Sequence, residues 1–124
     1  MQRIAIWNQA RTVRLSDSIE VADTSRLRVW GLLGRTKLDT GAGLWIKPSS
    51  GVHTFGMRFA IDVIGLDRHH RIVRLWQSLQ PWRVTPVSTA VRSVLELPAG
   101  FVSQFDLQIG DALLLESINN EQAP

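Results

Sequence analysis

The stretch FAIDVIGLDRHHRIVRLWQSL, residues 59–79, carries the clearest strand pattern of the chain. Two runs rich in Val, Ile and Leu, residues 59–66 and 71–79, flank a polar tetrapeptide that extends from Asp67 to His70. Two apolar runs joined by a short polar segment are typical of an antiparallel β-hairpin. The sequence therefore predicts a hairpin in the middle of the chain.

Alternating or short apolar segments on both sides of the hairpin predict further strands. They comprise residues 3–7, 12–15, 18–21, 44–46, 91–97 and 112–117. Pro81 and Pro86 bracket residues 82–85 and confine that segment to a sheet edge or a bend. The pattern predicts a mainly β fold, a compact β-sandwich or barrel-like domain with one or two short helices.

The helix with the clearer signal begins after residues 23–25, whose side-chain oxygens suit the free amides of a helix N-terminus. Apolar residues then recur at three-residue spacing from Leu27 to Leu33, and Gly34 is a suitable left-handed cap. A further turn of helix is expected within residues 101–107. Helix is therefore a minor component of the expected fold.

Length and composition indicate one ordinary globular domain. The chain has 124 residues, of which 44% are hydrophobic and 20% charged, so there is too little chain for two independent cores. We expect a single β-rich domain over residues 1–118 and a polar tail over 119–124. The absence of cysteine excludes disulfides, thiolate metal sites and a cysteine nucleophile, and it suits a reducing compartment.

No segment of the sequence resembles a membrane span or a signal peptide. Residues 1–13 are interrupted by Arg3, Asn8, Gln9 and Arg11 and hold no apolar stretch long enough for a signal peptide, and no window elsewhere approaches the length of a spanning helix. As written, the chain is expected in the cytoplasm; removal of an upstream leader would instead place it in the envelope.

The charges are distributed unevenly along the chain. Residues 1–92 hold all 14 Lys and Arg against six acids, a net charge of +8, whereas residues 93–124 contribute −5. If the last strands interleave with the first, these charges neutralise one another in space. This interpretation is preferred to a basic face for nucleic acid, which would need clustered bases, so a nucleic-acid partner is disfavoured.

Several short motifs occur in an order that resembles a known family. They are Gly31-Leu-Leu-Gly-Arg35, Gly43-Leu-Trp-Ile46, Val52-His-Thr-Phe-Gly-Met-Arg-Phe59, Ile61-Asp-Val63, Pro81-Trp-Arg-Val84, Ala90-Val-Arg-Ser-Val-Leu-Glu-Leu97 and Pro98-Ala-Gly100. In this order they resemble the bacterial family catalogued as domain of unknown function 192, over roughly residues 20–116. The resemblance implies the compact β-sandwich or barrel-like fold and brings no established reaction, ligand or partner.

Two positions depart from the pattern of that family. Ser49 stands where many relatives have a cysteine after the proline, and Ala60 stands where a proline precedes the Ile-Asp pair. Any redox or metal chemistry of such a cysteine would be absent from this chain.

The leading hypothesis is a non-catalytic accessory module that binds a small molecule or a protein, without a cofactor or a metal. It uses the region between the loop 48–58 and the segment 81–84, where several donors suit an anionic group or a peptide backbone. The candidate binding residues are His53, Thr54, Arg58, Asp62, Trp82, Arg83 and Glu96.

Two alternatives concern His53. In a small hydrolase or isomerase it would be the base, oriented by Asp62 or Glu96, with Arg58 holding an anion. In a purely structural role its ring would pack under the loop and bond a backbone carbonyl. A carboxylate within hydrogen-bond reach of the ring favours the enzyme, whereas a buried ring excludes it.

The remaining histidines and tryptophans have simpler explanations. His69 and His70 fall in the hairpin turn, and a metal site would need a third convergent ligand. Four of the five tryptophans are expected in the core. Trp82 is the exception, because an edge position beside Arg83 would allow it to form a binding lip.

Overall fold

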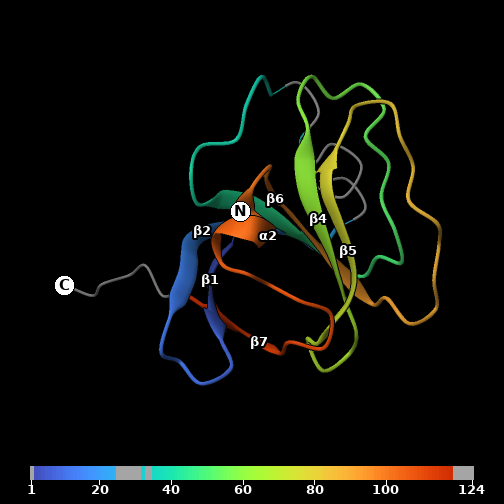
Figure 1. Cartoon of the computed structure of the whole chain (residues 1–124). Helices are drawn as coiled ribbons and strands as arrows, with labels where there is room; N and C mark the ends of the chain where they lie inside the picture. The colour runs from blue at the N-terminus through green and yellow to red at the C-terminus, as the bar shows by residue number, and fades with distance from the viewer. Residues whose placement is uncertain (1, 25–31, 33–34, 119–124) are drawn as a thin grey trace.

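A computed structural model describes residues 2–24, 32 and 35–118 (Figure 1). The elements are β1 (Arg3–Asn8), β2 (Arg14–Ala22), β3 (Ala42–Ile46), β4 (Ile61–Leu66), β5 (Ile72–Leu79), β6 (Ser93–Pro98), the short helix α2 (Phe101–Gln104) and β7 (Leu113–Ser117). The prediction of a mainly β fold is confirmed. The expected helix from Leu27 to Leu33 lies, apart from Leu32, outside the described residues.

The seven strands form one curled sheet in the order β5-β4-β6-β3-β2-β1-β7. All neighbours are antiparallel except β2 and β3. The two edge strands meet at one end, where Ile72 N donates to Asp111 O (2.8 Å) and Leu113 N donates to His70 O (3.0 Å). The sheet is thus a half-barrel, and the barrel-like alternative holds rather than the sandwich.

The predicted hairpin is present as β4 and β5. Of residues 12–15 and 18–21, expected as two strands, residues 14–15 and 18–21 belong to the single strand β2, and residues 12 and 13 precede it. The polar residues between the two expected strands coincide with a register shift in the pairing of β2 with β1. Ile4 pairs with Ile19, whereas Ile6, two residues on, pairs with Ser16, three residues back. Ser16 Oγ accepts a hydrogen bond from Ser18 N (3.0 Å) at this point. The break in alternation therefore marks a β-bulge and not a turn.

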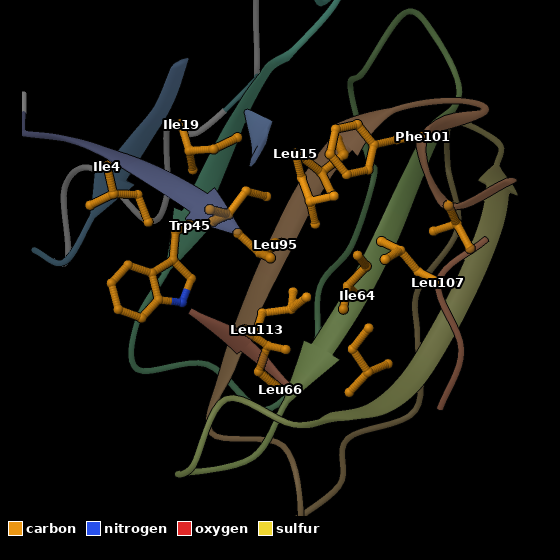
Figure 2. Close-up of a cluster of buried hydrophobic side chains, with 14 of the residues drawn as sticks. Ile4, Leu15, Ile19, Trp45, Ile64, Leu66, Leu95, Phe101, Leu107 and Leu113 are labelled. Carbon is orange, nitrogen blue, oxygen red and sulfur yellow. The ribbon is translucent and has the colours of Figure 1, made fainter. Parts of the chain in front are cut away.

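One apolar cluster fills the inside of the half-barrel (Figure 2). Leu95 and Leu97 reach it from β6, and Phe101 and Val102 reach it from α2. Its other buried members are Ile4, Ile6, Leu15, Ile19, Val21, Trp45, Ile64, Leu66, Ile72, Leu107 and Leu113. Strands from both ends of the chain thus contribute to one core.

A second cluster buries the outer face of the central strands. Its members are Ala22, Leu32, Leu44, Ile46, Met57, Ile61, Val63, Val91 and Val94. Met57 and the half-buried Val52 and Phe59 come from the long loop between β3 and β4. Because both faces are covered, every residue of β4 is buried, which explains its continuous apolar run.

The last strand places its acid, Glu116, beside a base of the first part of the chain. Strand β7 pairs with β1, and Glu116 forms a bidentate ion pair with Arg11. The two oppositely charged parts of the sequence therefore interleave, as the neutralisation hypothesis expects.

Gly43 on β3 marks the tightest approach inside the sheet. A Cβ atom at this position would lie 2.6 Å from the backbone oxygen of Glu96 and 2.8 Å from Leu97 Cδ2. Backbone cannot retreat without breaking the pairing of β3 with β6. A residue without a side chain is therefore required here.

We expect Gly43→Ala to lower the free energy of unfolding by about 1–3 kcal/mol, the usual cost of overpacking. Urea denaturation monitored by circular dichroism measures the change. Ile109→Ala is the matched control, because that side chain is 64% exposed and its truncation should leave the midpoint unchanged. Equal midpoints for Gly43→Ala and wild type would show that the steric argument is incorrect.

Candidate functional site

Two loops that are distant in sequence lie side by side. His53 and Val84 form an isolated antiparallel β-bridge. Thr54 N donates to Arg83 O (2.8 Å), and Trp82 N donates back to Thr54 O (3.0 Å). The structure therefore brings together four of the seven candidate residues, namely His53, Thr54, Trp82 and Arg83. We refer to residues 52–57 and 80–87 as the paired loops.

Two buried threonines hold the paired loops together. Thr54 Oγ1 donates to Gln80 O (2.7 Å) and accepts from Arg83 N (2.9 Å). On the other side of the bridge, Thr85 Oγ1 accepts from Val52 N (3.0 Å). Thr54 is fully buried and Thr85 is 3% exposed, so water does not compete for these bonds. Thr54 therefore fixes the loops and does not face a ligand.

An exposed row of rings crosses the paired loops. The centroids of His53 and Phe55 are 5.1 Å apart, and those of Phe55 and Trp82 are 6.0 Å apart with an interplanar angle of 27°. Phe55 is 46% exposed and Trp82 67%. Val84, 66% exposed, is the bridge partner of His53 and so projects to the same side. We name His53, Phe55, Trp82 and Val84 the aromatic patch.

The patch is a local concentration of exposed apolar surface. Six large hydrophobic side chains are exposed within the described residues, and four of them lie on the paired loops: Phe55, Trp82, Val84 and Val87. Trp82 has a left-handed backbone (φ 64°), which is costly for an aromatic residue and fixes its position in the turn. Arg83 is exposed beside it, and Arg58 is also exposed.

Asp62 is a structural carboxylate. It is fully buried in β4, where Oδ1 accepts from Ser78 N (2.8 Å) and Oδ2 accepts from Val102 N (2.9 Å). Val102 lies in the first turn of α2, whose N-cap, Gly100, has no side chain to satisfy it. Asp62 thus caps α2 from a neighbouring strand and lies away from solvent.

Glu96 is buried on the opposite face of β6 from Leu95 and Leu97. It is 4% exposed. Burial raises the pKa of Glu96 to about 7, because the charged form is poorly solvated there. Asp62, Glu96 and Thr54 are therefore the three candidate residues that do not reach the surface.

The geometry required of a base is not present at His53. Its Nδ1 accepts a hydrogen bond from Phe55 N (3.3 Å), and no carboxylate bonds the ring within the described part of the chain. The ring is exposed, so the expectation that it packs under the loop is wrong. Its neighbours Val52 and Thr54 are directed inward, so the side chain between them is directed to solvent.

His69 and His70 lie in the hairpin turn, as expected. Asp67 Oδ1 accepts from His69 N (2.8 Å) and from Arg71 N (2.9 Å), which stabilises the turn. No group of three His, Asp or Glu residues suited to a metal ion occurs in the described ranges.

Phe55 is the surface residue that the sequence interpretation missed. It lies in a turn that is closed by a hydrogen bond from Met57 N to Thr54 O (3.1 Å), so its side chain projects into solvent. Gly56 (φ 81°), the third residue of that turn, is the sequence signal that would have identified it.

The role of Thr54 leads to a first prediction for this site. Thr54→Val keeps the shape of the side chain but leaves Arg83 N and Gln80 O without their partner in a buried place. We expect a loss of about 1–3 kcal/mol in the free energy of unfolding, measured by urea denaturation. Thr54→Ser, which retains the hydroxyl, should lose less; equal losses would remove the hydrogen-bond explanation.

The raised pKa of Glu96 predicts a pH dependence of stability. Between the ordinary pKa of 4.5 and about 7 the folded protein retains a proton that the unfolded chain releases, so the free energy of unfolding falls as pH rises. The Glu96 contribution to this fall is on the order of 3 kcal/mol. Urea denaturation at about pH 5 and about pH 8 should show it in wild type and not in Glu96→Gln. Parallel profiles for the two proteins would contradict the assignment.

Comparison with known proteins places the chain in a family. The family DUF192, described as an uncharacterized ACR family, matches residues 6–115. A UPF0127 protein of Pyrococcus abyssi is 30% identical over 111 residues, covering 86% of this chain and 92% of that protein. One from Thermococcus gammatolerans is 30% identical over 100 residues, and the chain covers 64% of its length. These relatives are archaeal, so the expectation of a bacterial family was too narrow.

Two solved structures have the same fold. A protein of unknown function from Novosphingobium aromaticivorans has a TM-score of 0.74 at 19% identity, with 90% of this chain and 83% of that chain covered. A Sinorhizobium meliloti protein provisionally named a transcription regulator has a TM-score of 0.76 at 20% identity, with 92% of each covered. These likenesses show the fold alone. By its sequence, the chain belongs to the DUF192 family, whose curated members are named UPF0127 proteins and whose activity is not established.

Proposed function

We propose that the chain is a non-catalytic module that binds a partner protein through the aromatic patch. The observation that carries the proposal is the stacked and exposed pair Phe55 and Trp82 on loops held by buried hydrogen bonds. Apolar side chains exposed together on a fixed scaffold are typical of an interaction surface. Trp is also among the residues that most often dominate binding energy.

The composition of the surface specifies the partner's chemistry. Phe55 and Trp82 suit apolar side chains, and Val84 extends the apolar area. Arg83, exposed between Trp82 and Val84 in the chain, suits an acidic group at the rim of the same contact. We therefore expect an apolar segment flanked by Asp or Glu. The absence of cysteine suits a reducing compartment, and we place the interaction in the cytoplasm.

The other hypotheses have less support from the geometry. An enzyme using His53 lacks an orienting carboxylate within the described residues, because Asp62 is engaged by Ser78 N and Val102 N. Nucleic acid could stack on Trp82, but a stacking platform also needs a basic groove along the strand. The name of the Sinorhizobium protein applies to that protein alone.

The test is affinity capture from nuclease-treated lysate, followed by titration calorimetry with the purified candidate. We expect a protein that wild type retains and that Phe55→Ser with Trp82→Ser loses, with affinity lower by about a hundredfold. The matched control is Val13→Ser with Ile109→Ser, which removes two exposed apolar side chains elsewhere and should bind as wild type does.

Three results would overturn the proposal. Equal binding by both double variants would show that the surface is not used. Dimerisation of purified wild type that the patch variant abolishes would assign the surface to a second copy of this chain. Retention of nucleic acid, with affinity that falls steeply with added salt, would favour the nucleic-acid hypothesis.

A further inference from the structure

A cavity of about 560 Å³ lies at the end of the half-barrel where β3 ends and β6 begins. Its volume is within the range usual for small-molecule sites. The side chains that define it are Trp45, Lys47, Arg68, His70, Arg92 and Ser93. None of them belongs to the aromatic patch.

One wall of the cavity is an aromatic side chain fixed on two sides. Trp45 is 8% exposed and lies at the margin of the inner core in Figure 2. Lys47 Nζ lies 4.4 Å from the centroid of its ring, and the His70 ring meets it edge-on at 5.5 Å. This wall supplies an apolar surface with a cation directly above it.

Two buried polar atoms of the lining residues have no hydrogen-bond partner within the described residues. They are Ser93 Oγ and Trp45 Nε1, and Ser93 is 5% exposed. A buried hydroxyl or indole N–H without a partner is costly, and such groups are exceptional in folded proteins. Both groups can donate a hydrogen bond, and the described residues supply no acceptor for either.

The charges at the cavity favour an anion. Lys47, Arg68 and Arg92 carry positive charge, against Asp23 and Asp67. The Asp67 carboxylate already accepts hydrogen bonds from backbone N–H groups of the hairpin turn. These bonds weaken its electrostatic repulsion of an anion.

His70 adds a neutral group to the lining. The pKa of His70 is lowered, and partial burial is the largest cause. The Asp67 carboxylate raises this pKa, whereas the Lys47 cation lowers it further. The neutral imidazole can therefore donate to a ligand with one nitrogen and accept with the other at neutral pH.

We infer that this cavity binds a small organic anion, with a carboxylate or phosphate head near Lys47 and Arg92 and an apolar body against Trp45. The head would accept from Ser93 Oγ and from the two cationic side chains. Arg92 is exposed at the mouth, whereas Lys47 is half-buried, so the head enters from the solvent side. The inference is independent of the proposed protein surface.

The test is an NMR titration of the full chain, which follows the indole N–H resonance of Trp45. The probes are phenyl phosphate, benzoate and the uncharged benzyl alcohol, each up to about 10 mM, a range that detects millimolar affinity. We expect a saturable shift with phenyl phosphate or benzoate and none with benzyl alcohol. The two anions distinguish a phosphate head from a carboxylate head.

Variants connect the shift to the named side chains. Lys47→Gln and Arg92→Gln should each weaken binding about tenfold, the effect of losing one charge-assisted hydrogen bond. Lys47→Arg should restore much of the affinity, and Arg74→Gln, an exposed position on β5, is the control. No saturable shift with either anion, or equal affinity in Lys47→Gln, Arg92→Gln and wild type, would overturn the inference.

Discussion

The hydrogen bonds between the paired loops are the constraint on which the outer half of the molecule depends. The central strands are apolar on both faces, so the curled sheet can bury only one of them inside itself. The other face needs a cover, and irregular loops can provide it only if their backbone groups are satisfied. Thr54 and Thr85 meet this requirement by bonding the opposite loop on both sides of the His53–Val84 bridge.

This arrangement explains why a loop region carries the exposed aromatic patch. The buried threonines fix the backbone, so the adjacent rings are held in one arrangement without packing into a core. A binding surface that is already ordered loses less conformational entropy when a partner docks. The proposed anion site lies elsewhere, at the end of the half-barrel, where Trp45 belongs to the inner core and Ser93 Oγ has no hydrogen-bond partner among the described residues.

The sequence predicted most of the strands because their alternation and length follow directly from burial. It could not predict that residues 14–22 form one strand, since a bulge at Ser16 and a turn interrupt the pattern in the same way. The choice between sandwich and barrel depended on hydrogen bonds between the sheet edges, such as Ile72 to Asp111, which no local pattern reveals. At the candidate site, the approach of His53 to Trp82 was anticipated from two separate motifs. The burial of Thr54, Asp62 and Glu96 was not, because polar residues give no periodic signal of their depth.

If the threonines hold the paired loops as an ordered platform, the backbone amides of Thr54, Arg83 and Thr85 are protected in native-state hydrogen exchange. We expect protection comparable to that of amides in β4 and β6, because each of these three amides donates to the opposite loop. Exchange at the rate of an unprotected surface loop would show that the aromatic patch has no fixed scaffold.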